Sequence, residues 1–272
     1  TIGKKLLDYG LMNNIYSTHQ SIQYHVWGDS ELYRNLLGDF DRMNGDEIVY
    51  HEKSWEEEIE QLKEFDRIIV TETFRIDLIQ ALLHLHSDAE IDYYNPSGIG
   101  FAEIYMGEKL SSFGEMAKVI TEKNIKTDWL YRLAKKVNYE YTIQYDDTGI
   151  HSWAQPDVEM KMQEAWEKLN GFKKGSNVAC ADYHEIRLMV MKAFGINKDA
   201  MSYEQEEMLA EMEHIRWSRY HYVNHWHYAD VRNDDKRLHH LLKPYAELPE
   251  QEKKKDKNAF QVLLKDELRD DR

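Results

Sequence analysis

Hydrophobic and polar positions in the first 95 residues show two kinds of pattern, one typical of helices and one typical of strands. Together they predict an α/β domain. Apolar residues recur at helical spacing, as at Ile2, Leu6 and Leu11, whereas β-branched residues run together over 67–71, as in strands buried on both faces. We expect helices over 2–13, 30–43, 54–64 and 74–86, and strands over 22–27, 47–51, 67–71 and 89–94. This alternation is typical of a parallel sheet with right-handed crossovers.

The pattern changes at residues 95–100, where proline and glycine interrupt the chain. Residues 101–113 are expected to hold edge strands, and a helical pattern follows. The predicted helices are 127–137, 157–169, 177–193, 203–223 and 259–268. The chain is therefore expected to consist of an α/β domain over 1–95, a helical linker domain over 96–200 and a C-terminal module over 201–272.

Composition limits the classes of function. The 272 residues include 50 acidic and 35 basic residues, a formal net charge of −15, and positions 1–100 hold 19 acidic against 8 basic residues. General nucleic-acid binding is disfavoured, because a phosphate backbone needs a basic face. Cys180 is the only cysteine, so no intramolecular disulfide can form and we expect a cytoplasmic location. No apolar run is long enough to span a bilayer.

A series of short motifs after residue 208 resembles the ryanodine-receptor (RyR) repeat. That family has a helix ending in His and Trp, a Gly-Trp-x-Tyr-Gly turn, and a proline-containing run before a charged helix. The corresponding positions are 209–217, 226–228, 235–239, 244–245, 248–250 and 253–256. His225 and Ala229 stand where the family prefers Gly, and His240 stands where it prefers Pro, which puts the turn geometry in question. The resemblance implies that 201–272 is an RyR repeat in a mainly α-helical region.

Residues 171–177, followed by Ala181 and Asp182, resemble the helix that precedes this repeat in bacterial relatives. In those relatives a Trk-type (TrkA-N-like) Rossmann nucleotide-binding domain is common, so the resemblance implies a Rossmann-like fold for 1–95. Gly3 then corresponds to the last glycine of the phosphate-binding fingerprint, and Asp29 to the acidic residue that holds a ribose. The first strand and the leading glycines would precede Thr1. In the alternative interpretation, Asp29 caps the next helix and the domain is a scaffold.

The helix predicted over 203–223 carries the main candidate binding face. His214, Trp217 and His221 recur at helical spacing, and Arg216 and Arg219 flank them. An indole can stack on a nucleobase while a guanidinium holds a phosphate. The alternative is that the histidine and tryptophan are core residues that fix the repeat against neighbouring helices.

A second candidate lies at the predicted start of the helix over 177–193. Ser176 and Asn177 are expected to cap this helix, and Lys173 and Lys174 precede it. A helix N-terminus beside two lysines attracts anions, although simple capping explains the same residues. The expected ligand-binding residues are Lys174, Ser176, Asn177, His214, Arg216, Trp217, Trp226 and Tyr228.

We expect neither a catalytic nor a metal site. Glu211 and His214 form half of a di-iron motif, but the chain lacks a second copy. The other histidine pairs lack the spacing of zinc sites. Cys180 lies in a helix of small residues and is expected to be an inert, buried thiol.

The expected function is non-catalytic ligand sensing, in which a nucleotide or nucleotide-derived messenger controls an attached or partner element. In the Trk-type relatives that element transports ions. We expect a small anionic nucleotide-type ligand, a nucleotide or dinucleotide as cofactor, a homo-oligomer, and a membrane or channel segment before Thr1 that tethers the chain. Two alternatives stay open, an NAD-dependent oxidoreductase with Asp29 on the ribose and a structural interaction module without a ligand.

Overall fold

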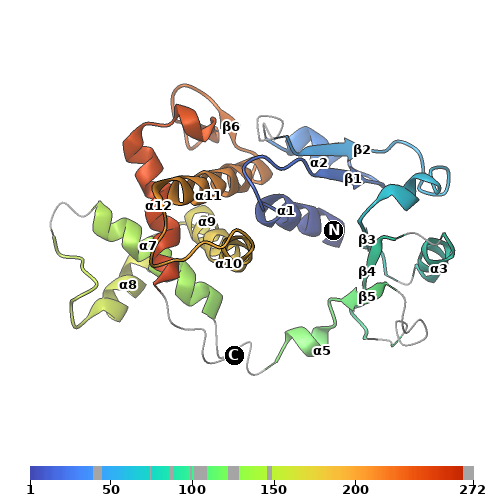
Figure 1. Cartoon of the computed structure of the whole chain (residues 1–272), viewed down its shortest axis with the longest axis horizontal. Coiled ribbons are helices and arrows are strands. Elements are labelled where there is room, and N and C mark those ends of the chain that lie inside the picture. Colours follow the sequence, from blue (N-terminus) through green and yellow to red (C-terminus); the bar gives the residue numbers. More distant parts are fainter. Residues whose placement is uncertain are drawn as a thin grey trace. The chain divides into compact units, whose positions relative to one another are not determined.

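The computed structural model describes residues 1–38, 45–73, 75–85, 88–98, 100, 109–121, 129–145 and 149–265. The chain forms two compact units (Figure 1). The first unit comprises Thr1–Leu6, His25–Ser30 and Val49–Asp128, and the second comprises Leu7–Tyr24, Glu31–Ile48 and Trp129–Arg272. Residues 7–24 and 31–48, from the stretch expected to form one α/β domain, thus belong to the second unit.

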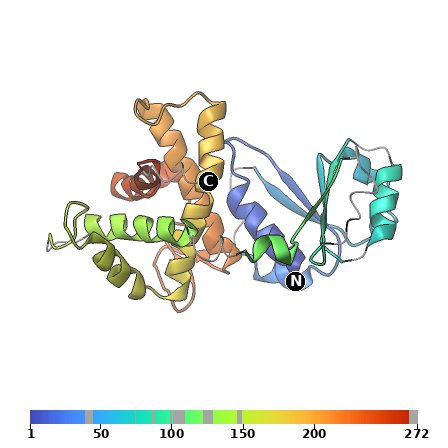
Figure 2. The same ribbon diagram turned by 90° about the horizontal axis from the view of Figure 1, so that it is seen from below.

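A three-stranded parallel sheet forms the centre of the first unit. Its strands, in order, are β3 (Arg67–Val70), β4 (Glu90–Tyr94) and β5 (Leu110–Phe113). Helix α3 (Ile76–His84) connects β3 to β4 and covers one face of the sheet (Figure 2). Leu82 of α3 packs with Val70 and Ile91 in the core of this unit. These elements confirm the strands predicted over 67–71 and 89–94 and the edge strand expected before 113.

Strand β3 is not buried on both faces, contrary to the prediction. Val70 is buried, but Ile69 is 47 % exposed. On the exposed side, Arg67 of β3 forms ion pairs with Glu90 and Asp92 of β4. The prediction was wrong because a continuous β-branched run also fits a strand with one open face, and among the described residues α3 covers only the other face.

Strands β1 (Gln23–Val26) and β2 (Glu47–Tyr50) pair with each other, not with the three-stranded sheet. Neither strand contains a fully buried residue. A strand without a buried apolar residue lacks the side chains that hold a central strand in a covered sheet. The described strands of the N-terminal half therefore form two small sheets, and a Rossmann fold stays a prediction.

Two predicted helices of the N-terminal half are shorter than expected. Helix α2 (Glu31–Leu36) replaces the helix over 30–43, whose residues 39–44 lie outside the described ones. The helix expected over 54–64 is wrong, since turns lead to a 3₁₀ helix, η2 (Gln61–Glu64). Glutamates one helical turn apart repel each other in this segment, and the side chain of Glu58 is held by tertiary hydrogen bonds. A short helix, α5 (Met116–Val119), follows β5.

Helices form most of the second unit. Part of α1 (Ile2–Asn13) and the whole of α2 belong to it. Its other α-helices are α7 (Trp129–Gln144), α8 (Val158–Glu167), α9 (Gly171–Asp182), α10 (His184–Ala193), α11 (Tyr203–Val223) and α12 (Glu250–Leu264). Helix α11 has the predicted bounds, and Ser202 and Gln205 form a capping box at its start. Most of its residues from Leu209 onward are buried, so α11 is the central helix of the unit.

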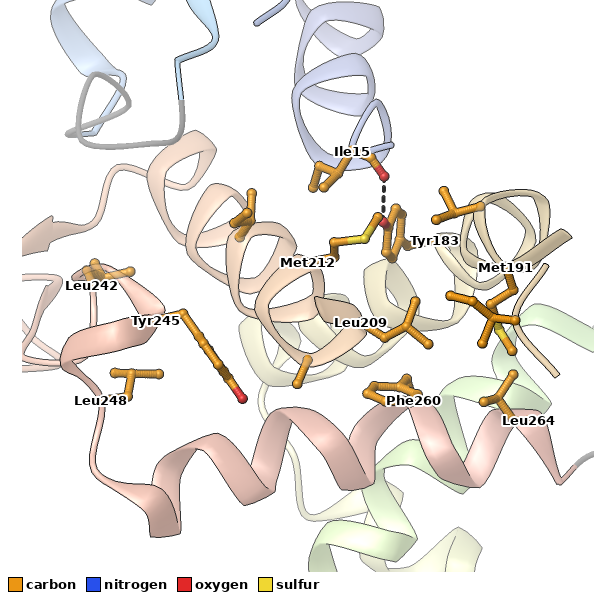
Figure 3. Close-up of a cluster of buried hydrophobic side chains, with 14 of the residues drawn as sticks. Ile15, Tyr183, Met191, Leu209, Met212, Leu242, Tyr245, Leu248, Phe260 and Leu264 are labelled. Atoms are coloured by element: carbon orange, nitrogen blue, oxygen red, sulfur yellow. Dashed lines mark hydrogen bonds between the residues drawn. The ribbon is translucent and has the colours of Figure 1, made fainter. Parts of the chain in front are cut away.

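The main core of the second unit lies between α11, α10 and α12 (Figure 3). Leu209 and Met212 of α11 pack there with Phe260 of α12. Tyr183 is fully buried, and its hydroxyl donates a hydrogen bond of 2.6 Å to the carbonyl oxygen of Ile15. This core fixes α11, whose opposite side faces the site described below.

The helix predicted over 177–193 is two helices, α9 and α10, which meet at Tyr183. Asn170 is the N-cap of α9, because its Oδ1 accepts a hydrogen bond from the Lys173 amide at 2.9 Å. Ser176 and Asn177 therefore lie inside α9, and their predicted capping role is wrong. The cap lies one helical turn before the lysines, where an asparagine in an extended conformation satisfies the free amides.

Short elements connect α11 to α12. They are β6 (His227–Tyr228), β7 (Leu238–His239) and the 3₁₀ helix η3 (Tyr245–Glu247). Helix α12 begins at Glu250, nine residues before the expected start, because Lys, Glu and Asp residues over 250–258 continue the helix along a solvated face. In the described part of the chain, no helix combines the length and apolar character needed to cross a membrane.

Candidate functional site

A cavity of about 810 Å³ lies in the second unit among α7, α9, α11, α12 and the segment between α11 and α12. Small-molecule sites usually have volumes of about 300–1,000 Å³. Aromatic rings line this cavity together with several buried charged groups. The cavity is thus large enough for a small molecule, and its lining is both aromatic and charged.

Helix α11 provides the aromatic wall. His214, Trp217 and His221 all line the cavity. The ring centroids of His214 and Trp217 are 5.6 Å apart with nearly parallel planes, and those of Trp217 and His221 are 4.0 Å apart. Trp226 stacks on Phe172 of α9 at 5.0 Å and also lines the cavity. The structure thus places the α11 face that the sequence singled out on the cavity wall.

A buried cluster of three charges lies at the base of this wall. Arg216 Nε and Nη2 donate hydrogen bonds to Glu213, and Arg187 Nη2 donates to the same carboxylate at 2.6 Å. All three side chains are at most 2 % exposed. Two guanidinium groups share one carboxylate, so the cluster holds a surplus positive charge. Arg216 Nη1 has no hydrogen-bond partner among the described residues, and Arg216 lines the cavity.

A buried His214–Asp256 pair adjoins this cluster. His214 Nε2 donates to the carbonyl oxygen of Lys243 at 2.8 Å, and Nδ1 lies 3.3 Å from Asp256 Oδ2. Burial lowers the pKa of His214, but the hydrogen bond and charge of Asp256 outweigh it, so that pKa is raised. Burial raises the pKa of Asp256, which the hydrogen bond from His214 offsets only in part. The folded pair therefore binds a proton more tightly than a free imidazole does.

Two cations of the cavity lining have acidic partners. Arg232 forms an ion pair with Asp234 at 2.6 Å, and Lys255 pairs with Glu252 at 2.7 Å. Arg237 donates to the backbone carbonyl of Asn224. Lys173 also lines the cavity, whose lining holds five cationic and five acidic side chains. The surplus positive charge is therefore local, in the buried cluster of Arg187, Arg216 and Glu213.

The structure places the predicted ligand residues in two groups. Six of them line the cavity: Ser176, Asn177, His214, Arg216, Trp217 and Trp226. Lys174 is outside the lining, with its ammonium 5.9 Å from the Trp166 ring centroid, and the Tyr228 hydroxyl donates to Asp230. Arg219 does not flank the cavity face, because it is bound to Asp46 at 2.6 Å and to the carbonyl of Leu11.

The two predicted cofactor residues belong to the first unit and do not line the cavity. Gly3 lies in α1, and a Cβ atom there would be 3.1 Å from Thr71 Oγ1, just beyond β3. This close approach explains the small residue at position 3. Asp29 is exposed in the bend after β1. Binding of a ribose by Asp29 and of a phosphate near Gly3 stays a prediction.

Several lining residues were missed in the sequence. Asn138 of α7 is buried, and its Nδ2 has no partner among the described residues. Asp256 and His239 are also part of the lining. A signal existed for Asp256, since it shares helical spacing with Phe260 and Leu263 and therefore lies on the buried face of α12. For Asn138, which follows the buried Val137 in α7, the surrounding sequence does not indicate that the amide lines a cavity.

The cavity does not contain an evident nucleophile. Cys180 lines it, but burial raises the pKa of its thiol to about 12. A thiol with this pKa carries almost no thiolate at neutral pH. Within the described ranges, no group of His, Cys, Asp and Glu side chains is arranged to hold a metal ion.

Fold and site define the C-terminal part as a helical module with a ligand-sized cavity, and comparison with known families identifies it. Residues 194–268 match the family model of the RyR domain. No curated protein and no solved structure matches the chain. The match contains α11 and α12 but not α7 or α9, so the RyR domain supplies only part of the cavity wall.

The turn after α11 has a left-handed backbone at His225. His225, at the position where the RyR repeat prefers Gly, has a φ of 66°. This left-handed conformation favours glycine and is uncommon for other residues. The ring Nδ1 of His225 hydrogen-bonds with the carbonyl oxygen of Leu36. This hydrogen bond fixes the imidazole against the residue that ends α2.

Proposed function

We propose that this chain is a non-catalytic sensing module that binds a nucleotide or nucleotide-derived messenger in the cavity of the second unit. The observation that carries the proposal is the cavity lining, in which stacked aromatic rings adjoin a buried arginine cluster with surplus positive charge. An aromatic ring can stack on a nucleobase, and a guanidinium donor pairs with phosphate oxygens.

A two-group ligand explains why both features occur in one cavity. Trp217 offers an apolar ring, whereas Arg216 has an unpaired Nη1 donor in the described structure. A buried donor without an acceptor costs about 1–3 kcal/mol, which an anionic ligand would recover. A purely apolar ligand would leave that cost in place. A nucleotide supplies both an aromatic ring and an anion.

A calorimetric and thermal-shift screen tests this proposal. The probes are AMP, GMP, NAD, ADP-ribose and the cyclic dinucleotides of adenine and guanine. We expect at least one probe to bind without being consumed, and Trp217→Leu to weaken it about tenfold or more, since one stacked base contributes about 1–3 kcal/mol. Trp129→Leu, on the exposed start of α7 and outside the lining, is the matched control. Binding by no probe, or equal binding by wild type and Trp217→Leu, would overturn the proposal.

The proposal extends to regulation. A sensor must bind its ligand more tightly in one conformation than in another. We propose that this preference controls an attached or partner element, an ion-transport element included, and that the chain acts as a homo-oligomer. Light scattering of the purified chain with and without a binding nucleotide measures the oligomeric state and any change in it.

A further inference from the structure

The turn after α11 contacts both the cavity and a segment from the N-terminal part of the chain. The ring of Trp226 stacks on Phe172 at 5.0 Å and lies 5.2 Å from the ring of His221, and all three residues line the cavity. The backbone of Trp226 lies against Gly38, which follows α2 and is outside the lining. Trp226 is only 6 % exposed, so one buried residue connects the cavity to a segment that is distant in the sequence.

The contact at Gly38 leaves no space for a side chain. A Cβ atom at this position would collide with the carbonyl oxygen of Trp226 and would lie 2.9 Å from the Cα atom of Tyr222. Both of these neighbours are backbone atoms, so neither can give way by a side-chain rotation. The φ of Gly38 lies outside the left-handed region, so close packing alone requires glycine here. A methyl group at position 38 would therefore displace the turn after α11 or the segment over 36–38.

Hydrogen bonds also join this segment to the end of α11. The carbonyl oxygen of Tyr222, in the last turn of the helix where carbonyls lack intrahelical partners, accepts from the amides of His225 at 2.9 Å and Gly38 at 3.0 Å. The ring Nδ1 of His225 donates to the carbonyl oxygen of Leu36. A non-glycine residue keeps a left-handed backbone such as that of His225 only where surrounding contacts hold it. The segment over 36–38 supplies such contacts.

We propose that the segment over 36–38 sets the position of the Trp226 ring, so that ligand binding in the cavity and the position of this segment are coupled. The inference rests on the proposed function and names the part of the chain that responds to the ligand. A ligand that binds only one arrangement of Trp226 favours the matching arrangement of 36–38, and this coupling is reciprocal. The RyR family match contains Trp226 but not 36–38, so the responding segment lies outside the RyR domain.

NMR of the free protein tests the positioning without a ligand. Nuclear Overhauser contacts between the rings of Trp226 and Phe172 report the position of the indole. We expect Gly38→Ala to weaken these contacts, because the added methyl group displaces the turn. Gly10→Ala is the matched control, since a Cβ atom there would meet its nearest neighbours at 3.5 and 3.6 Å, which are ordinary contact distances. Unchanged contacts in Gly38→Ala would overturn the inference.

Calorimetry and amide hydrogen exchange test the coupling. The probe is the tightest binder among AMP, GMP, NAD, ADP-ribose and the cyclic dinucleotides of adenine and guanine. We expect it to slow exchange of the Gly38 amide in the wild type. Gly38→Ala should weaken its binding about fivefold or more, although residue 38 does not line the cavity. His225→Gly keeps a residue suited to the left-handed backbone but removes the bond to Leu36, so exchange of the Gly38 amide should become faster.

The outcomes separate this inference from the proposed function. If a nucleotide binds, but its affinity is equal in wild type and Gly38→Ala and exchange at Gly38 does not change, the coupling is wrong and nucleotide sensing stands. If no nucleotide binds while the Trp226 contacts weaken in Gly38→Ala, the positioning is supported and nucleotide sensing is wrong. Should Gly38→Ala fail to fold, His225→Gly decides. An exchange rate of the Gly38 amide equal to that of the wild type would then overturn the inference.

Discussion

Each unit contains a tryptophan, a histidine and a carboxylate in contact, and the two clusters have opposite acid–base properties. In the first unit, Trp27 stacks on His51 at 3.8 Å, and both donate hydrogen bonds to Glu58 Oε2, at 3.0 and 2.7 Å. In the second unit, Trp217 stacks on His214, whose Nδ1 faces Asp256.

The difference lies in what surrounds each carboxylate. Burial raises the pKa of Glu58, but the hydrogen bonds from Trp27 and His51 outweigh it, and that pKa is lowered. The pKa of Asp256 is raised, because burial between α11 and α12 exceeds the effect of its single bond from His214. The same three residue types therefore accompany a lowered carboxyl pKa in one unit and a raised carboxyl pKa in the other. Residue composition alone does not determine the charge of such a cluster.

Removal of the Glu213 carboxylate should give the largest loss of stability among these substitutions. Glu213→Ala leaves Arg187 and Arg216 buried without a shared carboxylate, which we expect to cost about 3–5 kcal/mol of stability. Urea unfolding monitored by hydrogen exchange of α11 measures the loss in the second unit. Glu60→Ala, which removes an exposed ion pair with Lys63 in the first unit, is the control and should change stability by less than about 1 kcal/mol. A similar loss in both variants would contradict the interpretation.

The pH dependence of stability should have opposite signs in the two units. A raised His214 pKa stabilises the folded state below about pH 6.5, and this stabilisation is lost as pH rises through the folded pKa, with a slope of at most about 1.4 kcal/mol per pH unit. A lowered Glu58 pKa stabilises the folded state above about pH 4.3, and this is lost as pH falls. Hydrogen exchange of α11 and β3 as a function of pH checks both.

Single substitutions assign those slopes to residues. Asp256→Asn should flatten the slope of the second unit above pH 6.5, and Glu58→Gln should flatten the acid slope of the first. If either substitution leaves its slope unchanged, another titrating group is responsible for it.

The smallest expected effect comes from the two tryptophans. Trp27→Phe removes the indole donor to Glu58, so the pKa of this carboxyl should rise towards its ordinary value. Trp217→Phe removes no hydrogen bond to Asp256 and should leave the Asp256 pKa unchanged. Carboxyl ¹³C chemical shifts followed through a pH titration report both values. A rise of equal size in the two variants would mean that ring stacking, not hydrogen bonding, sets the Glu58 pKa.

Local signals predicted what depends on local structure. The bounds of α11 are as predicted, because residues 203–223 follow a continuous helical pattern and Ser202 caps the start of the helix. The helix over 54–64 is wrong because the contacts of Glu58 with Trp27 and His51 come from other segments. The face of His214 and Trp217 was evident from spacing along one helix. Asn138 was not, because its place on the cavity wall depends on how α7 packs against the helices of the RyR domain.

The shared carboxylate of Glu213 also bears on where a domain ends. Glu213 lies inside the stretch that matches the RyR family model, whereas Arg187 of α10 lies before its first residue, Phe194. A fragment that begins at Phe194 would lack Arg187, one of the two arginines that bind the buried Glu213 carboxylate. It would also lack Tyr183, over whose ring Arg187 lies. We therefore expect the stretch defined by sequence similarity to be less stable on its own than together with α10.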